Sequence, residues 1–208
     1  MADFTGHELS AKPARDVVDL LRRKEVSPKE LLDISFARID AVGKDVNATV
    51  TQCRDRAYGQ IEGLAALDES NPGWLGGLPI GIKDLNEVGG VVTTMGSWGL
   101  RDFVPPASSP LIETIENRGG VITGKTNTPE FGAGGNTFND VFGYTRNPWD
   151  TRKNAGGSSG GAAASLAVGE TWLSQGSDLA GSLRTPAGYC GVCGFRPTPG
   201  RAGGGPGP

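Results

Sequence analysis

The chain has 208 residues, which is enough for one large domain or two small ones with a sizeable core. Its net charge is −3 and no long run of Lys or Arg occurs, so composition gives no support for binding nucleic acid or a membrane. The 34 Gly and 14 Pro are about twice the ordinary share, and because apolar residues fall in periodic blocks we interpret them as tight turns in a folded domain.

The chain contains three cysteines and one histidine, and these low numbers limit the disulfides and the catalytic sites that it can form. Cys53, Cys190 and Cys193 are too few and too unevenly spaced for a disulfide framework. His7 lies in a polar N-terminal segment, which argues against a Ser-His-Asp or Cys-His hydrolase. No apolar stretch approaches the ~18 residues that span a bilayer, and the N-terminus lacks the parts of a secretory signal, so we expect a cytoplasmic protein.

The first third of the chain carries helical patterns. Residues 11–24 place apolar side chains at helical spacing. A second helix is expected from Ser27 to about Val42, because Ser27 can cap it, Pro28 suits its first position and Glu30 completes a capping box. After it we expect a short strand at 47–51, a helix at 54–67 and a loop with a turn at 68–77.

The rest of the chain is rich in Gly and alternates strands with helices. We expect strands at 78–82, 121–123 and 172–174, and helices at 109–119, 161–168 and 182–189. This alternation predicts an α/β fold with a mixed or parallel sheet that helices cover on both faces. We divide the chain into an N-terminal helical segment (1–75), an α/β core (76–201) and a disordered Gly/Pro tail (202–208).

Residues 119–126 match the P-loop pattern G-x4-G-K-[ST]. A working P-loop follows a strand and opens a helix, so that N–H groups at the helix start cradle phosphate. Here a helix is expected to end at Gly119 and a strand to lie inside the motif. We therefore interpret the match as a helix stop followed by a strand, and a phosphate-analogue binding assay separates the two readings.

Residues 190–193 form a C-x-x-C pair. A redox motif needs a reactive Cys at a helix N-terminus, and a zinc site needs two further ligands, for which only His7 and Cys53 remain. We expect a strand that packs small residues at this position.

Two Gly-Ser elements, at 156–161 and 176–182, stand next to expected helices and can present serine hydroxyls. Serine is a poor nucleophile without a base, and with no usable His the base must be a carboxylate, a Tyr or a Lys. Lys83 ends the apolar run 78–83, where a charged side chain is costly unless it is paired, neutral or functional. The pattern thus favours serine nucleophile chemistry, with a carboxylate, a Tyr or a Lys as the base.

In collinear order from about Ser10 to Arg201, the chain resembles the amidase-signature hydrolases. The motifs that carry the resemblance are 81–84 (GIKD), 124–127 (GKTN), 146–149 (RNPW), 156–161 (GGSSGG), 176–187 (GSDLAGSLRTPA) and 190–197 (CGVCGFRP). The resemblance is specific, because several motifs would have to coincide.

The resemblance implies a Ser–cis-Ser–Lys triad, in which Ser182 is the nucleophile, Ser158 the bridging cis-serine and Lys83 the base. It also implies an oxyanion hole of backbone N–H groups at Leu179, Ala180, Gly181 and Ser182, and supporting roles for Ser159, Asp178 and Arg184. Burial lowers the pKa of a lysine, so a neutral Lys83 can accept a proton passed from Ser182 through Ser158. No metal or cofactor is required.

This chain departs from the family in two respects. The nucleophile motif reads Ala180-Gly181-Ser182, where the family usually has Gly-Gly-Ser. Family chains are also considerably longer, so we expect this chain to lack part of the sheet and of the substrate pocket. We therefore expect it to be marginally stable, to associate through exposed surface and to be inactive by itself.

The function we expect is hydrolysis of a small-molecule carboxamide, with homo-oligomerisation left open. One alternative is the glutaminase (A) subunit of a tRNA-dependent amidotransferase, which works with partner subunits. The other is a truncated, inactive amidase remnant. Residues 126–131 look more like stand-alone amidases than like the glutaminase, and co-purification with a partner separates these two.

Overall fold

The computed structural model describes residues 5–202. The α-helices are α1 (Ala14–Arg22), α2 (Pro28–Val46), α3 (Arg54–Ile61), α4 (Pro110–Asn117), α5 (Gly160–Val168) and α6 (Arg184–Cys190). The strands are β1 (Thr49–Gln52), β2 (Pro79–Lys83), β3 (Val121–Thr126), β4 (Phe138–Asn139), β5 (Gly143–Tyr144), β6 (Arg146–Asn147), β7 (Asp150–Asn154) and β8 (Leu173–Gln175). Of the tail expected to be disordered, residues 203–208 lie outside the described residues.

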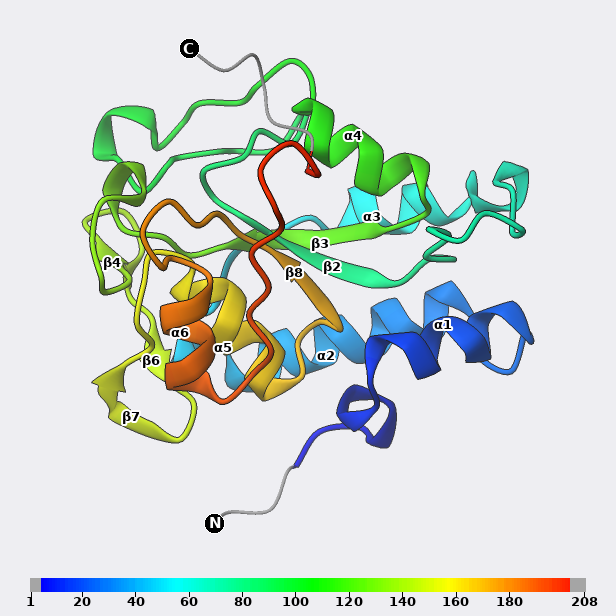
Figure 1. Cartoon of the computed structure of the whole chain (residues 1–208), viewed down its shortest axis with the longest axis horizontal. Coiled ribbons are helices and arrows are strands. Elements are labelled where there is room, and N and C mark those ends of the chain that lie inside the picture. The colour runs from blue at the N-terminus through cyan, green and yellow to red at the C-terminus, as the bar shows by residue number, and fades with distance from the viewer. Residues whose placement is uncertain (1–4, 203–208) are drawn as a thin grey trace.

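The central sheet has the order β1-β3-β2-β8 (Figure 1). β2 pairs in parallel with β3 on one side and with β8 on the other, whereas β1 runs antiparallel to β3. The expectation of a mixed sheet is therefore confirmed. β1 joins this sheet, so the segment that we expected to precede the core contributes a strand to it.

Helices lie on both sides of the sheet, with α4 on one side and α2 and α5 on the other (Figure 1). Ile80, Ile82 and Ile122 pack with Ile112 of α4 in one apolar cluster. On the other side, Ala163 and Ala164 of α5 pack in a second cluster. Both β2 and β3 are buried along their whole length, as expected for parallel strands that helices cover on both faces, although the second half of β3 carries polar and charged side chains.

The N-terminal helices follow the capping chemistry in the sequence. Ser27 caps α2, since its hydroxyl accepts a hydrogen bond from the Glu30 N–H at 3.1 Å. The first helix was expected to start at residue 11 but starts at Ala14, because Pro13 is its N-cap. Residues 8–11 form a separate 3₁₀ turn (η1, Glu8–Ala11), which His7 caps by accepting from the Leu9 N–H.

The expectation of a strand at 190–193 is wrong. Cys190 is the last residue of α6, and Gly191 ends that helix in the left-handed conformation with φ of 71°. All three cysteines are free. The short hairpins β4–β5 and β6–β7 were not expected at all, because two-residue strands leave no periodic signal in the sequence.

Residues 119–126, which match the P-loop pattern, do not have the strand-loop-helix structure that a P-loop nucleotide site needs. α4 ends at Asn117, Gly119 turns the chain with φ of 83°, and the rest of the motif lies in β3. Lys125 is fully buried inside that strand, and no helix follows it directly. The interpretation as a helix stop followed by a strand is confirmed.

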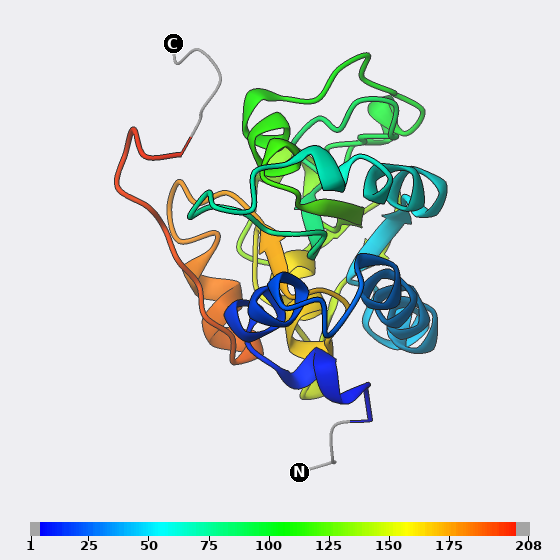
Figure 2. The ribbon, with the colours of Figure 1, turned by 90° about the vertical axis from the view of Figure 1, so that its right-hand side faces the viewer.

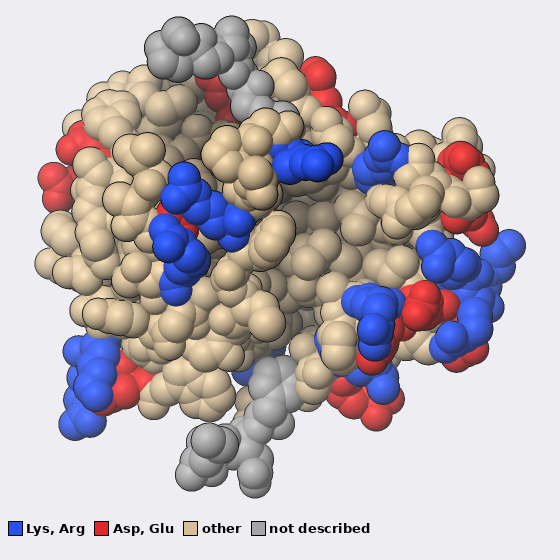
Figure 3. Space-filling view, viewed as in Figure 1, with Lys and Arg blue, Asp and Glu red and all other residues tan. Residues whose placement is uncertain are grey.

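After α6, the chain runs along the outer side of α6 and β8 (red in Figure 2). On the face in Figure 3, charged side chains form small clusters, with both signs interleaved at the α1 end, and no continuous basic field covers that face. Within residues 5–202, no helix has the length and apolar character to cross a bilayer.

Candidate active site

Lys83 is the last residue of β2, at the carboxyl end of the parallel strands. Its side chain is fully buried, and its Nζ lies 2.6 Å from Ser158 Oγ and 2.9 Å from Ser177 Oγ. Burial lowers the pKa of Lys83 to about 7, although the negative charge of Asp178 acts in the opposite direction. A substantial fraction of this amine is therefore neutral near pH 7.

Ser158 lies in the glycine-serine loop that leads into α5. The peptide bond between Gly157 and Ser158 is cis, and Ser158 is buried. The Thr137 hydroxyl donates to the Gly156 carbonyl at 2.9 Å and accepts from the Gly160 N–H at 3.0 Å. Backbone atoms of neighbouring loops also approach Gly157 too closely for any side chain to fit there. The loop is thus fixed on both sides of Ser158.

Asp178 organises the turn that carries Ser182. Its buried carboxylate accepts hydrogen bonds from the N–H groups of Gly181, Leu183 and Arg184 and from the guanidinium of Arg184. The hydrogen bond from Arg184, followed by those from the backbone, holds the pKa of Asp178 well below its usual range. The turn therefore closes around a carboxylate that stays ionised.

Ser182 is half-buried, and its carbonyl accepts from the Ser159 N–H at 3.0 Å. Its backbone is thereby fixed to the loop of Ser158. Within residues 5–202, however, its hydroxyl makes no hydrogen bond. The structure thus joins Lys83 to Ser158 directly and joins Ser182 to their loop only through the backbone.

The amide groups expected to form an oxyanion hole are not equivalent. The Gly181 N–H already donates to Asp178 Oδ1 at 2.7 Å. Across the described part of the chain, the N–H groups of Leu179, Ala180 and Ser182 have no acceptor. Gly181 therefore cannot serve as a donor in this arrangement, whereas the other three amides can.

Sequence reasoning missed Ser177, whose hydroxyl is the second partner of Lys83. The signal was present, since Ser177 stands in the same Gly-Ser element as Ser182. It also missed the ion pair of Asp84 and Lys125, which are 41 residues apart in the sequence. Lys125 Nζ lies 2.9 Å from Asp84 Oδ1, and both side chains are buried.

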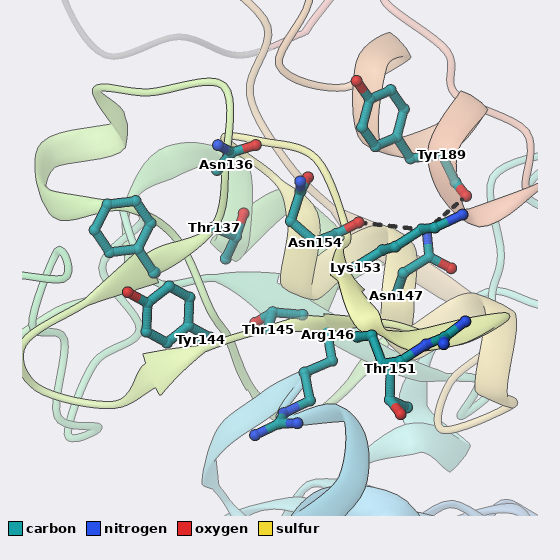
Figure 4. Close-up of a pocket in the computed structure, with 12 residues that line it drawn as sticks. Asn136, Thr137, Tyr144, Thr145, Arg146, Asn147, Thr151, Lys153, Asn154 and Tyr189 are labelled. Atoms are coloured by element: carbon teal, nitrogen blue, oxygen red, sulfur yellow. Dashed lines mark hydrogen bonds between the residues drawn. The ribbon is translucent and has the colours of Figure 1, made fainter.

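A cavity of about 680 Å³ lies beside the β4–β5 and β6–β7 hairpins and does not include Lys83, Ser158 or Ser182 in its lining (Figure 4). Many of its polar side chains already bind the chain's own backbone. Asn147, for example, donates to the carbonyls of Asn154 and Tyr189, which Figure 4 shows as dashed lines. Of the residues that line the cavity, Thr137 also holds the Ser158 loop through its bonds to Gly156 and Gly160.

The described residues contain no group of three or more His, Cys, Asp or Glu side chains able to hold a metal ion. His7, the single histidine, caps η1.

Comparisons with known proteins identify the family of the chain. The model of the Amidase family matches residues 30–204. The A subunit of the glutamyl-tRNA(Gln) amidotransferase from Carboxydothermus hydrogenoformans is 40% identical over 194 residues, which are 92% of this chain and 40% of the relative. The chain thus spans about two fifths of the length of this curated relative.

Two solved structures also resemble the chain. A bacterial aryl acylamidase of the amidase signature family superimposes with a TM-score of 0.84 and 33% identity, over 91% of this chain and 40% of that one. A 6-aminohexanoate cyclic dimer hydrolase complexed with substrate gives a TM-score of 0.81 and 30% identity, over 89% of this chain and 37% of that one.

Proposed function

Since the chain belongs to the Amidase family, we propose that it carries the machinery that hydrolyses a carboxamide to a carboxylate and ammonia or an amine through an acyl-enzyme. The observation that carries the proposal is the 2.6 Å contact between Lys83 Nζ and Ser158 Oγ in a buried setting. A lysine with a pKa of about 7 is matched to general-base work near neutral pH.

The proposed reaction begins when the Ser182 hydroxyl turns toward Ser158 as substrate binds. Ser182 Oγ attacks the carbonyl carbon, its proton passes to Ser158, and the Ser158 proton passes to Lys83. The tetrahedral intermediate then collapses as the C–N bond breaks, and the proton returns along the same path to the leaving nitrogen. Water, activated by the same relay, hydrolyses the acyl ester and frees Ser182.

The amides of Leu179, Ala180 and Ser182 are the proposed donors to the oxyanion, and one such donor contributes about 3–4 kcal/mol to transition-state stabilisation. Ser159, Asp178 and Arg184 act by holding the two loops, since they contact neither the attacking oxygen nor the base directly. No step needs a metal or a cofactor.

A second candidate is a glutaminase that works as one subunit of an amidotransferase. It is favoured by the 40% identity to the A subunit of such an enzyme over most of this chain. The chemistry at Ser182 is the same, with glutamine as substrate and ammonia passed to a partner. Ammonia release from glutamine, compared with release from simple aliphatic and aryl amides, separates the two candidates.

The test of the proposed function is labelling with a fluorophosphonate, followed by peptide mapping. We expect the label on Ser182, its loss in Ser182→Ala, and its retention in Ser70→Ala, which changes an exposed loop serine. A label on another residue overturns the assignment of the nucleophile. A folded chain that takes no label supports the third reading, an inactive remnant.

A further inference from the structure

A buried network lies next to the site but outside the proposed reaction. Lys125 Nζ lies 2.9 Å from Asp84 Oδ1 and donates to Thr93 Oγ1 at 2.7 Å. The Asp84 carboxylate also accepts from the Thr94 hydroxyl at 2.6 Å and from the Thr94 N–H at 3.2 Å. These four side chains are almost completely buried. The ion pair is therefore connected directly to the segment that starts at Thr94.

Thr94 opens a tight turn. The Ser97 N–H donates to the Thr94 carbonyl at 2.9 Å, and the central residues Met95 and Gly96 have φ of 52° and 69°. Two left-handed central residues define a type I′ turn, which normally uses Asn, Asp or Gly. Methionine is strained in this region, so surrounding contacts must hold it. One of them is the Thr94 hydroxyl, which accepts from the Gly96 N–H at 3.0 Å.

A second turn of the same type, at residues 130–133, contacts the first. The Ala133 N–H donates to the Glu130 carbonyl at 3.0 Å, and Phe131 and Gly132 have φ of 50° and 71°. The Phe131 N–H donates to the Met95 carbonyl at 2.7 Å, which joins the two turns. Phenylalanine is as unusual at such a position as methionine is, so the strain occurs twice in contacting segments.

At Gly132 the second turn lies next to the Ser158 hydroxyl. A Cβ atom built on Gly132 would lie 3.7 Å from Ser158 Oγ and 2.6 Å from Leu85 Cδ1. The turn thus forms a wall beside the hydroxyl that Lys83 binds. A continuous set of contacts leads from the ion pair through Thr94, Met95 and Phe131 to this wall.

We propose that Asp84 and Lys125 are positioning residues, whose ion pair holds the two stacked turns and thereby sets the wall against which a substrate lies beside Ser158. This inference rests on the proposed amide hydrolysis. Asp84 follows Lys83 directly, but Lys83 Nζ contacts Ser158 and Ser177, whereas the Asp84 carboxylate contacts Lys125 and Thr94, so the pair can act on the turns without touching the base. The buried charges then hold the strained turns, and these turns position the substrate.

The main test uses Thr94→Val, which keeps shape and burial but removes the hydroxyl between Asp84 and Gly96. Lys125→Met is less useful alone, because an unpaired buried carboxylate destabilises the whole fold. Thr123→Val is the matched control, since Thr123 is equally buried and its hydroxyl bonds only the Ile80 carbonyl. Thr94→Ser restores the hydroxyl and serves as the rescue variant.

Two readouts are needed, both on the full chain. We expect the second-order rate of fluorophosphonate labelling to fall about tenfold in Thr94→Val, because small displacements at a reacting centre have large rate effects. The pH at which labelling is half-maximal should stay unchanged, and Thr94→Ser and Thr123→Val should label as the wild type does. Hydrogen exchange of the Phe131 amide should accelerate at least tenfold in Thr94→Val and stay slow in Thr123→Val.

Equal rate losses in Thr94→Val and Thr123→Val would show a general loss of stability and overturn the proposal. So would a shifted pH midpoint in Thr94→Val, since the network would then act on Lys83. A wild-type chain that takes no label contradicts the proposed function instead. In that case the Phe131 amide still decides whether the ion pair holds the turns.

Discussion

Ser159 and Ser177 are joined twice: the Ser159 hydroxyl donates to the Ser177 carbonyl at 3.1 Å and accepts from the Ser177 N–H at 3.2 Å. Each serine is the neighbour in sequence of a residue with a proposed role in the site, Ser158 in one loop and Asp178 in the other. The double contact therefore fixes the relative positions of both loops, so that Ser158 and Ser177 reach the same Lys83 Nζ.

Breaking this double contact should loosen both loops. Ser159→Ala leaves the Ser177 N–H and carbonyl without these partners, which costs about 1–3 kcal/mol for a buried group. We expect a lower free energy of unfolding together with labelling at least tenfold slower. Ser165→Ala is the control, because it removes a buried hydroxyl of α5, the helix that Ser159 precedes, and this hydroxyl bonds only the Ala162 carbonyl. Similar labelling rates in both variants would contradict a role in the site.

The pH dependence of labelling should report Lys83. Burial lowers its pKa to about 7, so the neutral, basic form increases as pH rises through 7 and the labelling rate should rise with it. Lys83→Ala should slow labelling by about 10²–10⁴, the usual range for general-base catalysis. Lys44→Ala, at an exposed helical lysine, should have no effect. A flat rate from pH 5 to 9 would rule out a lysine base that titrates in this range.

Glu170 should make the fold less stable at high pH. Burial raises its pKa to about 7, against the opposing effects of the Thr49 hydroxyl and of Arg38. Because the folded-state pKa lies above the unfolded value, stability is full below pH 4 to 5 and decreases as pH rises through 7. Glu170→Gln should therefore raise the melting temperature at pH 8 relative to wild type and change it little at pH 5. Glu69→Gln, at an exposed residue, is the control, and parallel melting curves for both variants would contradict the prediction.

β8 should promote self-association. It ends the sheet and pairs only with β2 among the described strands, and Leu173 on it is 39% exposed. The segment after α6 passes beside β8 but leaves Leu173 partly exposed, and an edge strand with an exposed apolar side chain favours pairing with another chain. We expect concentration-dependent dimers or larger species in size-exclusion chromatography, and Leu173→Lys should reduce them. Val104→Lys, at an exposed valine in a distant loop, should not, and a monomer at all concentrations would refute the prediction.

Local chemistry in the sequence predicted much of this fold. The Ser27 cap, the turn at Gly119 and the apolar runs of β2 and β3 each depend on neighbouring residues, and the structure has all of them. The family motifs also predicted Lys83 and Ser158 as members of one site, and the two side chains are in contact.

The remaining features depend on contacts between distant segments. Asp84 and Lys125 look like ordinary charges in the sequence, and only the parallel register of β2 and β3 brings them together. The turns at Met95 and Phe131 have no Asn or Asp at these positions, so the sequence does not predict their left-handed conformation. The engagement of the Gly181 N–H by Asp178 is likewise visible only once the turn is folded.

The position of β2 between β3 and β8 also has a consequence for the order of folding during synthesis. The strand that carries Lys83 receives its second neighbour only after Gln175 has been made, and Gln175 accepts a hydrogen bond from the Lys83 N–H across 92 residues. At ribosomal rates of roughly 5–20 residues per second, this interval lasts about 5–18 s. Throughout that time the edge of β2 that later pairs with β8 lacks this partner strand, and an unpaired strand edge favours pairing with other chains.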